Sequence, residues 1–238
     1  MLAKVLRAAA RRLGMRRYLA ATPGKNNRLY QPVFSPWLDP AGFGRTYEDI
    51  QPFTLVDPQR CWVLYSLARQ ARHLAGEFWE CGVYRGGTAR LLARVARQDE
   101  RALRLFDTFA GMPTPDATRD WHQAGDFSDT SKEEVRRVVD YAHAMLHPGR
   151  LPGTFQGLED RVVSLAHVDV DLYQSVLDSC CFIYPRLAAG GIMVFDDYGW
   201  RTCPGAKLAV DEFFEDKPEV PLILPTGQAV VVRLPANP

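Results

Sequence analysis

The sequence predicts a doubly wound α/β protein with a mostly parallel sheet. Three observations predict it. Short apolar runs alternate with segments of helical period from residue 58 onward, a glycine-rich turn follows the first such run, and acids follow two later runs. Such alternation gives parallel strands with helices on both faces. With 238 residues and 47% hydrophobic content, the chain supports one substantial core.

The predicted elements begin with a helix over 58–73. The elements after it are strand 77–82, helix 87–98, strand 103–107, helix 131–146, strand 161–169, helix 173–187, strand 191–196, helix 205–215 and strand 229–234. The long polar segment 113–130 interrupts this order, and we expect it to cover the substrate, with a solvated connection as the alternative. Residues 58–238 are therefore predicted to form one α/β domain.

The segment before this domain has a different character. Its first 25 residues are basic, contain no acid and carry leucines at helical spacing. This pattern predicts a solvated helix used in packing or dimerisation, with a targeting or membrane-surface helix as the alternative. Residues 26–58 are rich in Pro, Gly and aromatic rings, which favours an irregular arm over the core. We therefore expect residues 1–57 to form an N-terminal arm or lid.

The charge balance and the cysteines limit the classes of binding partner and the cellular compartment that we expect. The formal net charge is +1, which gives no reason to expect nucleic acid as a partner, and no stretch approaches the length of a membrane span. A small substrate suits this balance better. The five cysteines are odd in number and show no Cys-x-x-Cys spacing. We interpret them as reduced, structural thiols and expect a cytoplasmic protein.

Four aspartates follow two of the predicted strands. Asp169 and Asp171 end one apolar run, and Asp196 and Asp197 end the next. Strand ends of an open parallel sheet form the crevice where ligands bind, and carboxylate oxygens are ligands that Mg²⁺ prefers. The four acids therefore predict a divalent-metal site. Ordinary turn capping is the alternative for Asp196 and Asp197.

A glycine turn and two further acids predict the second ligand. Glu80 and Gly82 end the first strand, and Asp107 ends the second, where a doubly wound fold places an acid against ribose hydroxyls. The turn lacks the G-x-G-x-x-G spacing expected for a pyrophosphate. A nucleoside with a short carboxylate tail fits better, and S-adenosylmethionine has that outline. The further residues predicted to contact this cofactor are Tyr84, Gly86, Thr88 and Ser128.

Four motifs give the chain a family resemblance. They are ECGVYRGG at 80–87, FDTFAGMP at 106–113, HVDVDLY at 167–173 and DDYG at 196–199. Over about residues 50–235 the chain resembles the macrocin O-methyltransferase family. The resemblance implies a Rossmann-like methyltransferase fold and methylation of a sugar hydroxyl on an antibiotic with S-adenosylmethionine and Mg²⁺. It also implies a small-molecule glycosylated acceptor and a homodimer or higher homo-oligomer.

Carried over by residue, the resemblance implies that Asp169, Asp196 and Asp197 bind the metal and that Asp171 is the general base. The period of two along an extended strand puts Asp169 and Asp171 on one face, which supports this division. His167 lies inside the apolar run, and we expect a buried histidine with satisfied hydrogen bonds rather than a ligand.

Two rival functions stay open. A metal-dependent glycosyltransferase would also use Asp169-Val170-Asp171 to hold a nucleotide sugar, although the turn at Glu80 and the acid at Asp107 predict a nucleoside without a diphosphate. The second rival is a non-catalytic binding protein with the same fold. Its acids would be expected to have decayed, whereas all four are present.

Overall fold

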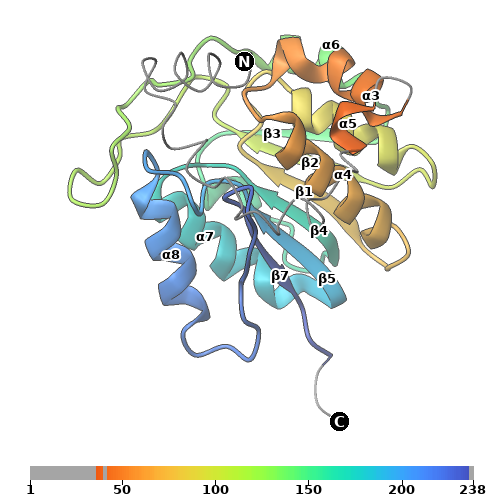
Figure 1. Ribbon diagram of the computed structural model, residues 1–238. Coiled ribbons are helices and arrows are strands. Elements are labelled where there is room, and N and C mark those ends of the chain that lie inside the picture. The colour runs from red at the N-terminus through yellow and green to blue at the C-terminus, as the bar shows by residue number, and fades with distance from the viewer. Residues whose placement is uncertain (1–35, 40–41, 236–238) are drawn as a thin grey trace, which may run out of the picture. The chain divides into compact units, whose positions relative to one another are not determined.

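The structure is a computed structural model that describes residues 36–39 and 42–235 (Figure 1). The predictions for the basic N-terminal helix and for residues 26–35 lie outside these residues. The described chain belongs to one compact unit that begins at Pro36. Within this part of the chain, no helix is both long and apolar enough to cross a membrane.

A seven-stranded sheet forms the centre of the fold, in the order β3-β2-β1-β4-β5-β7-β6. The pairs from β3 to β5 are parallel, and β7 runs antiparallel to β5 and β6. The strands are β1 (Glu77–Cys81), β2 (Leu103–Asp107), β3 (Ala144–Pro148), β4 (Val163–Val168), β5 (Leu187–Phe195), β6 (Leu222–Ile223) and β7 (Ala229–Val232). The mostly parallel α/β fold predicted from the sequence is confirmed.

Helices cover both faces of this sheet (Figure 1). The α-helices are α3 (Phe43–Ile50), α4 (Pro58–Ala71), α5 (Gly87–Ala96), α6 (Lys132–Val139), α7 (Tyr173–Ile183) and α8 (Pro204–Phe214). Apolar residues of α3 to α6 make one core with the first face, and those of α7 and α8 make the other. The alternation along β1 serves both cores, because Phe78 packs into the first and Trp79 into the second.

Short 3₁₀ turns complete the described elements. They are η2 (Pro36–Leu38), η3 (Gln51–Phe53), η4 (Gly153–Phe155) and η5 (Tyr184–Arg186). The part of the expected arm that is described is more regular than predicted, because α3 occupies residues 43–50. Its Phe43 and Ile50 are buried in the core beside α4 and α5. These two residues are therefore apolar because they pack into the core of the sheet domain.

The predicted helix over 131–146 is wrong in its second half. Helix α6 ends at Val139 because Asp140 takes a left-handed conformation, with φ of 41°. The run from Ala144 to Pro148 then forms strand β3 at the edge of the sheet, parallel to β2. The sequence pattern misled because a half-buried edge strand and the last turns of an amphipathic helix both show mixed apolar and polar residues.

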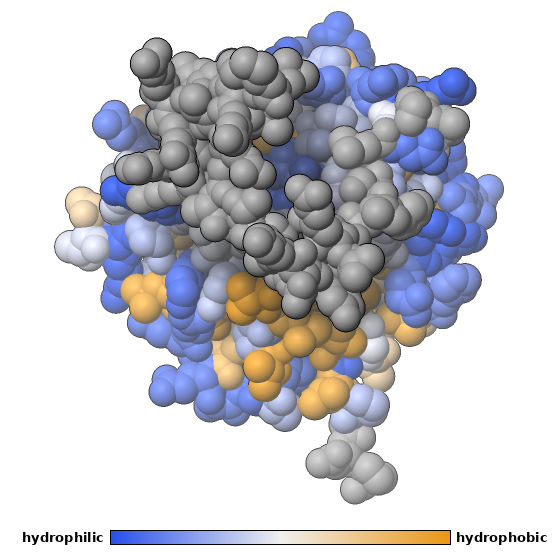
Figure 2. Space-filling model, in the orientation of Figure 1, coloured by the Kyte–Doolittle hydropathy of each residue, from blue (hydrophilic) through white to orange (hydrophobic). Residues whose placement is uncertain are grey.

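Apolar side chains gather on the lower part of the face shown in Figure 2. The exposed apolar residues near the C-terminal end of the described chain are Val220, Leu222, Ile223, Val232 and Leu234. Leu222 and Ile223 make up the two-residue edge strand β6. An edge strand this short offers few free backbone groups to another chain.

Gly82 permits the closest approach between two strand ends. It has φ of +83°, and a Cβ there would lie 1.7 Å from the carbonyl oxygen of Asp169. A Gly82→Ala variant is therefore expected to lose more than the about 1–2 kcal/mol of unfolding free energy that left-handed backbone alone costs. Urea unfolding followed by circular dichroism measures this. Gly153→Ala, where a Cβ meets nothing within 4 Å, is the control and should unfold at nearly the same midpoint. Equal stability of both variants would contradict the expected close approach.

Candidate active site

The candidate site lies where the order of the sheet reverses. From β1 the chain continues to β2 and β3 on one side, and then returns to place β4 on the other side of β1. The carboxyl ends of the strands on either side of such a point diverge and leave a crevice for ligands. A cavity of about 430 Å³ opens there, large enough for a small organic ligand.

Most of the predicted site residues line this cavity. They are Gly82, Tyr84, Thr88, Asp107, Asp169, Asp171 and Asp197. Four predicted residues are not among its lining residues: Glu80, Gly86, Ser128 and Asp196. The structure therefore brings the glycine turn and three of the four aspartates to one cavity, and it leaves the remaining aspartate behind the cavity wall.

Asp107 organises the turn after β1. Its Oδ2 accepts hydrogen bonds from the backbone N–H groups of Val83 at 2.7 Å and Tyr84 at 3.0 Å, and its Oδ1 accepts one from Phe109 at 2.8 Å. Oδ2 thus uses both of its lone pairs, and the lone pair of Oδ1 that Phe109 leaves free is available to a ligand hydroxyl. Helix α5 starts at Gly87 without a side-chain cap, so its first N–H groups are available to an anionic group.

Glu80 has a different setting from the one predicted. Its side chain is fully buried, and its Oε1 lies 2.8 Å from Nδ1 of His167. Burial raises the pKa of Glu80. Its Oε2 has no hydrogen-bond partner among the described residues, so one acceptor next to the turn is unsatisfied. A donor group on a bound ligand would satisfy it.

His167 is buried, as predicted, but only its Nδ1 is satisfied. Its Nε2 lies 3.5 Å from Oδ1 of Asp196 and has no hydrogen-bond partner in the described chain. Burial disfavours the imidazolium, but the neighbouring carboxylates of Asp196, Glu80 and Asp169 outweigh it and raise the pKa of His167 to about 10. The ring is therefore a buried positive charge behind the acids.

Asp196 is held by protein donors. Arg60 of α4 donates to its Oδ2, and Gln228 donates to its Oδ1 at 2.8 Å. Burial alone would raise its pKa, but His167 and Arg60 together lower it. The Arg60 guanidinium is fixed in turn by Asp57, whose Oδ2 lies 2.7 Å from Nε, and by stacking on Trp200 at 4.5 Å. Asp196 is therefore an ionised anchor in a network that ties α4 to β5 and β7.

For Asp169 and Asp197, burial and neighbouring negative charges outweigh the effect of nearby donors and positive charges on the pKa. Burial raises the pKa of Asp169 well above its usual range, and the charge of Asp196 adds to this. Burial likewise raises the pKa of Asp197, together with the charges of Asp171 and Asp169. Ligand atoms of His167, Asp169 and Asp196 lie within 4.8 Å of one another, and Asp197 is not part of that group. The oxygen donors of these aspartates fit a hard ion such as Mg²⁺. Asp196 can join them only through the lone pairs that Arg60 and Gln228 leave free.

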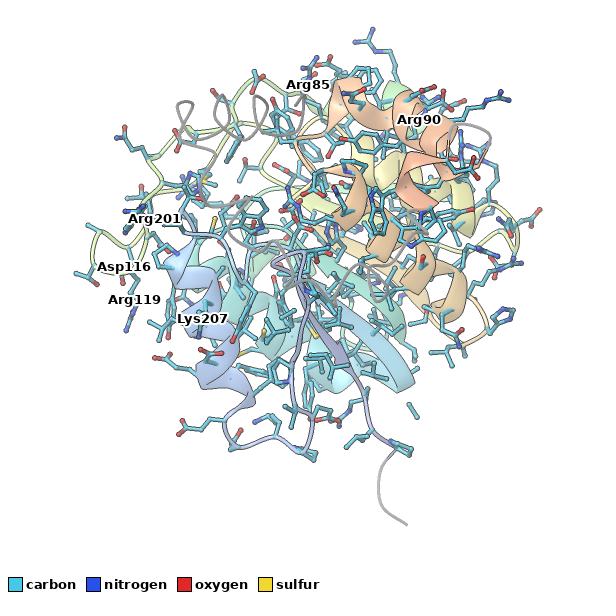
Figure 3. All side chains as sticks on the ribbon, in the orientation of Figure 1. Arg85, Arg90, Asp116, Arg119, Arg201 and Lys207 are labelled. Carbon is cyan, nitrogen blue, oxygen red and sulfur yellow. The ribbon has the colours of Figure 1, made fainter. Side chains whose placement is uncertain are left out.

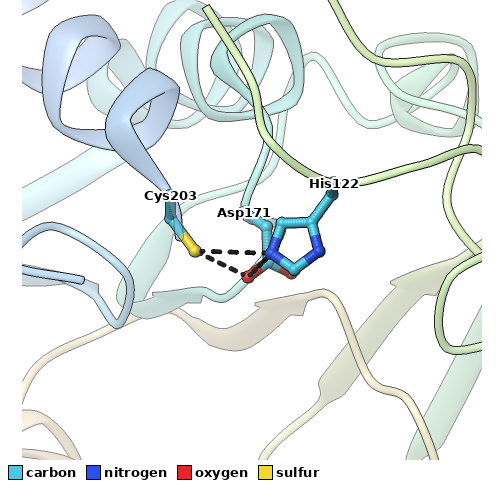
Figure 4. A group of neighbouring side chains, drawn as sticks. All are labelled: His122, Asp171 and Cys203. Carbon is cyan, nitrogen blue, oxygen red and sulfur yellow. Dashed lines mark hydrogen bonds and ion pairs between the residues drawn. The ribbon is translucent and has the colours of Figure 1, made fainter. Parts of the chain in front are cut away.

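Asp171 lies between these acids and the polar loop. Its φ of 57° is left-handed, a conformation that Asp and Asn tolerate best among residues with a side chain, and its backbone N–H donates to Oδ2 of Asp197 at 3.0 Å. Its carboxylate meets Cys203 and His122 (Figure 4). The Cys203 thiol donates to its Oδ1 at 3.1 Å, and Nε2 of His122 lies 3.7 Å from the same oxygen. Burial raises the pKa of Asp171.

The polar segment 113–130 contributes part of the cavity wall. Asp120, which is buried, joins this segment to the start of α7, because its Oδ1 accepts from the backbone N–H of Tyr173 at 2.9 Å. Its Oδ2 accepts from the N–H of Asp116, also at 2.9 Å. Arg119 lies over the Tyr173 ring at 4.2 Å, and Figure 3 shows it next to Asp116. The segment is therefore an ordered wall of the cavity, which supports the expected cover over a substrate.

Sequence reasoning missed four contributors to this site: Arg60, His122, Cys203 and Gln228. Each comes from outside the acid-bearing strand ends, so no strand pattern pointed to it. One signal was available for Arg60, because it shares a helix face with buried Leu64 and Ala68, where an arginine needs a partner. Cys203 was interpreted as a structural thiol, whereas its Sγ contacts Asp171 at the cavity wall.

The five cysteines are free, as predicted, and all but Cys181 are buried.

The fold and the site together define a class of protein. A seven-stranded, mostly parallel sheet with a ligand crevice at β1 and β4 is the Rossmann-like fold of S-adenosylmethionine-dependent O-methyltransferases. The model of the family described as Macrocin-O-methyltransferase (TylF) matches residues 51–223, and the chain belongs to that family.

Individual relatives agree with this family. The chain is 30% identical over 157 residues to demethyldecarbamoylnovobiocin O-methyltransferase of Streptomyces niveus, a match that covers 59% of each chain. It is 29% identical to the 8-demethyl-8-(2,3-dimethoxy-alpha-L-rhamnosyl)-tetracenomycin-C 4'-O-methyltransferase of Streptomyces olivaceus, over 55% of this chain and 56% of the relative. The matches thus span less than two thirds of these curated relatives.

Among solved structures, the O-methyltransferase NovP superposes with a TM-score of 0.69 and 25% identity, covering 77% of this chain and 83% of NovP.

Proposed function

We propose that the protein transfers a methyl group from S-adenosylmethionine to a hydroxyl of a sugar moiety on a glycosylated natural product, with Mg²⁺ as metal and Asp171 as general base. The observation that carries this proposal is the single cavity shared by the glycine turn with Asp107 and the acids Asp169, Asp171 and Asp197. Family membership and relatives named for methylation of novobiocin and tetracenomycin compounds support the acceptor class.

The turn after β1 would hold the cofactor. Asp107 fixes the backbone of Val83 and Tyr84 through Oδ2 and offers the free lone pair of Oδ1 to a ribose hydroxyl. The uncapped start of α5 suits the carboxylate of the methionine part, and the unpaired Oε2 of Glu80 suits its ammonium. When bound, S-adenosylmethionine supplies a methyl group on a positively charged sulfur.

Asp169 and Asp197, with Asp196 through its free lone pairs, would hold Mg²⁺. When bound, the ion would lower the pKa of an acceptor hydroxyl and fix its position. Asp171 would accept the hydroxyl proton at its carboxylate, which the left-handed backbone and the N–H contact to Asp197 hold at the cavity wall. The polar segment anchored by Asp120 restricts the approach of water. The main remaining contribution of the site would be to align the acceptor oxygen with the methyl carbon of the cofactor.

Family membership favours methyl transfer over a metal-dependent glycosyltransferase. The glycosyltransferase alternative is supported only by the Asp-x-Asp pattern. A homodimeric state and a cytoplasmic location stay predictions. Sedimentation of the full chain measures the first of them.

Cofactor binding is the first test of this proposal. Isothermal titration of S-adenosylhomocysteine into the unsubstituted protein should show one site. Asp107→Asn should weaken binding by about 10- to 100-fold, the effect of losing a hydrogen bond to a charged acceptor of about 1.5–3 kcal/mol. The exposed Asp160 provides a matched control, and Asp160→Asn should bind normally.

The melting temperature of each variant separates a loss of affinity from a loss of fold, because Asp107 also supports two turns. Absence of S-adenosylhomocysteine binding to the folded, unsubstituted protein would refute the proposed function. If UDP-sugars raised the melting temperature and S-adenosylhomocysteine did not bind, the glycosyltransferase alternative would be favoured.

A further inference from the structure

We propose that His122, Asp171 and Cys203 form a second metal site, which binds a borderline-soft divalent cation such as Zn²⁺ and is separate from the Mg²⁺ site proposed above. The three side chains come from the polar segment, the end of β4 and the start of α8, and Figure 4 shows their ligand atoms facing one another. No role in methyl transfer was assigned to His122 or Cys203.

The spacing of the three ligand atoms is that of a tetrahedral zinc site. Cys203 Sγ lies 3.1 Å from Asp171 Oδ1 and 3.7 Å from His122 Nε2, and His122 Nε2 lies 3.7 Å from Asp171 Oδ1. Zinc bonds of about 2.0–2.3 Å to nitrogen, oxygen and sulfur at tetrahedral angles put such atoms about 3.3–3.6 Å apart. An ion can therefore bind all three after shifts of less than about 0.5 Å.

The histidine is already oriented as a ligand. Its Nδ1 lies 3.1 Å from Oδ2 of Asp126, which also accepts the backbone N–H of Gln123 at 3.0 Å. A carboxylate on Nδ1 holds the proton there and leaves the lone pair of Nε2 facing Asp171 and Cys203. This is the outer-shell arrangement that zinc-binding histidines use.

The site is partly sheltered and still reachable. Side-chain exposure is 16% for His122 and 18% for Asp171, and Cys203 is buried. All three line the cavity, so water inside it could reach an ion bound there and supply the fourth ligand. On binding, the Cys203 thiol loses its proton to the solvent and coordinates as thiolate, and no other bond is broken.

Donor chemistry separates this site from the Mg²⁺ site. Nitrogen and sulfur donors select Zn²⁺ and Co²⁺ and have little affinity for Mg²⁺, whereas Asp169 and Asp197 present only oxygen. Occupancy of the second site takes Asp171 Oδ1 away from the acceptor hydroxyl. Zn²⁺ is therefore expected to inhibit methyl transfer. This inhibition rests on the proposed function, but the binding of Zn²⁺ does not depend on it.

Cobalt spectroscopy tests the site without any assay of activity. The reduced full-length protein, stripped with a chelator and kept in excess Mg²⁺, is titrated with Co²⁺. We expect one equivalent to produce a near-ultraviolet thiolate-to-cobalt band and visible bands of tetrahedral intensity, which one equivalent of Zn²⁺ removes. Cys203→Ala and His122→Ala should abolish these bands. Asp126→Asn should weaken Zn²⁺ affinity by about 10- to 100-fold.

Matched controls are available in the same chain. Cys181→Ala removes the exposed thiol, and His143→Ala removes an exposed imidazole, and both variants should keep the full cobalt spectrum. Circular dichroism establishes that each variant is folded, and Cys203→Ser replaces the alanine variant if that one is not. Absence of the thiolate band in the unsubstituted protein, or its persistence in folded Cys203 variants, would overturn the site. Binding without S-adenosylhomocysteine affinity would refute the proposed function and leave the second site standing.

Discussion

An Asp171→Asn variant is expected to lose about 10²- to 10⁴-fold in kcat, the range typical of a missing general base. Asparagine keeps the size of the side chain and tolerates the left-handed backbone at this position, with φ of 57°. What it loses is the carboxylate that we propose accepts the hydroxyl proton. The affinity for S-adenosylhomocysteine should stay within a factor of two or so, because Asp171 is assigned no cofactor contact.

Single-turnover formation of S-adenosylhomocysteine, with a panel of glycosylated acceptors bearing free sugar hydroxyls, measures this effect. The exposed Asp160→Asn again serves as the control and should turn over at the unsubstituted rate. A rate within a few-fold of normal for Asp171→Asn would remove Asp171 from the role of base.

An Asp197→Asn variant is expected to be more stable than the unsubstituted protein without metal and far less active with it. Burial and the charges of Asp171 and Asp169 raise the folded-state pKa of Asp197 well above the unfolded value of about 3.9. A raised carboxyl pKa means that the folded protein binds more protons than the unfolded chain, so the ionised group costs stability as pH rises above that unfolded value. Asparagine removes this cost at neutral pH and keeps an oxygen for the Asp171 N–H.

Thermal melting in EDTA and in millimolar Mg²⁺, at pH 5 and pH 8, provides the readout. Without metal, the advantage of Asp197→Asn should be larger at pH 8 than at pH 5. Mg²⁺ should raise the melting temperature of the unsubstituted protein and have a smaller effect on the variant. A variant that melts lower in EDTA at both pH values would show that Asp197 is a structural group, contrary to its proposed role as a ligand.

The parts of the fold that could be predicted are those set by local pattern. Strand β4 is fully buried and flanked by turn residues, so the sequence pattern predicts both the strand and the position of the acids after it. Strand β3 was missed because Asp140 ends α6 by a left-handed residue that is not glycine. Aspartate adopts this conformation more readily than most residues, but not often enough for the sequence to reveal it.

In the site, sequence patterns could predict the acids at strand ends but not their partners. Arg60 reaches Asp196 across 136 positions of sequence, and Gln228 reaches it across 32. His122 belongs to a polar segment with no helical or strand period, and its place beside Asp171 depends on the anchor that Asp120 makes with α7. Such contacts follow from tertiary packing, which no local periodicity records.

The anchor at Asp120 divides the polar segment into positions with different tolerance to change. Asp120 bonds to the first residue of α7, two positions after Asp171, so an altered anchor moves the wall and the proposed base together. Trp121 next to it is 60% exposed and has no such bond. Redesign of acceptor preference should therefore keep Asp120 fixed and diversify the exposed positions of 113–130. Because Asp171 itself lies outside 113–130, the wall of the cavity can vary in sequence while the bond from Asp120 to α7 keeps the proposed base in place.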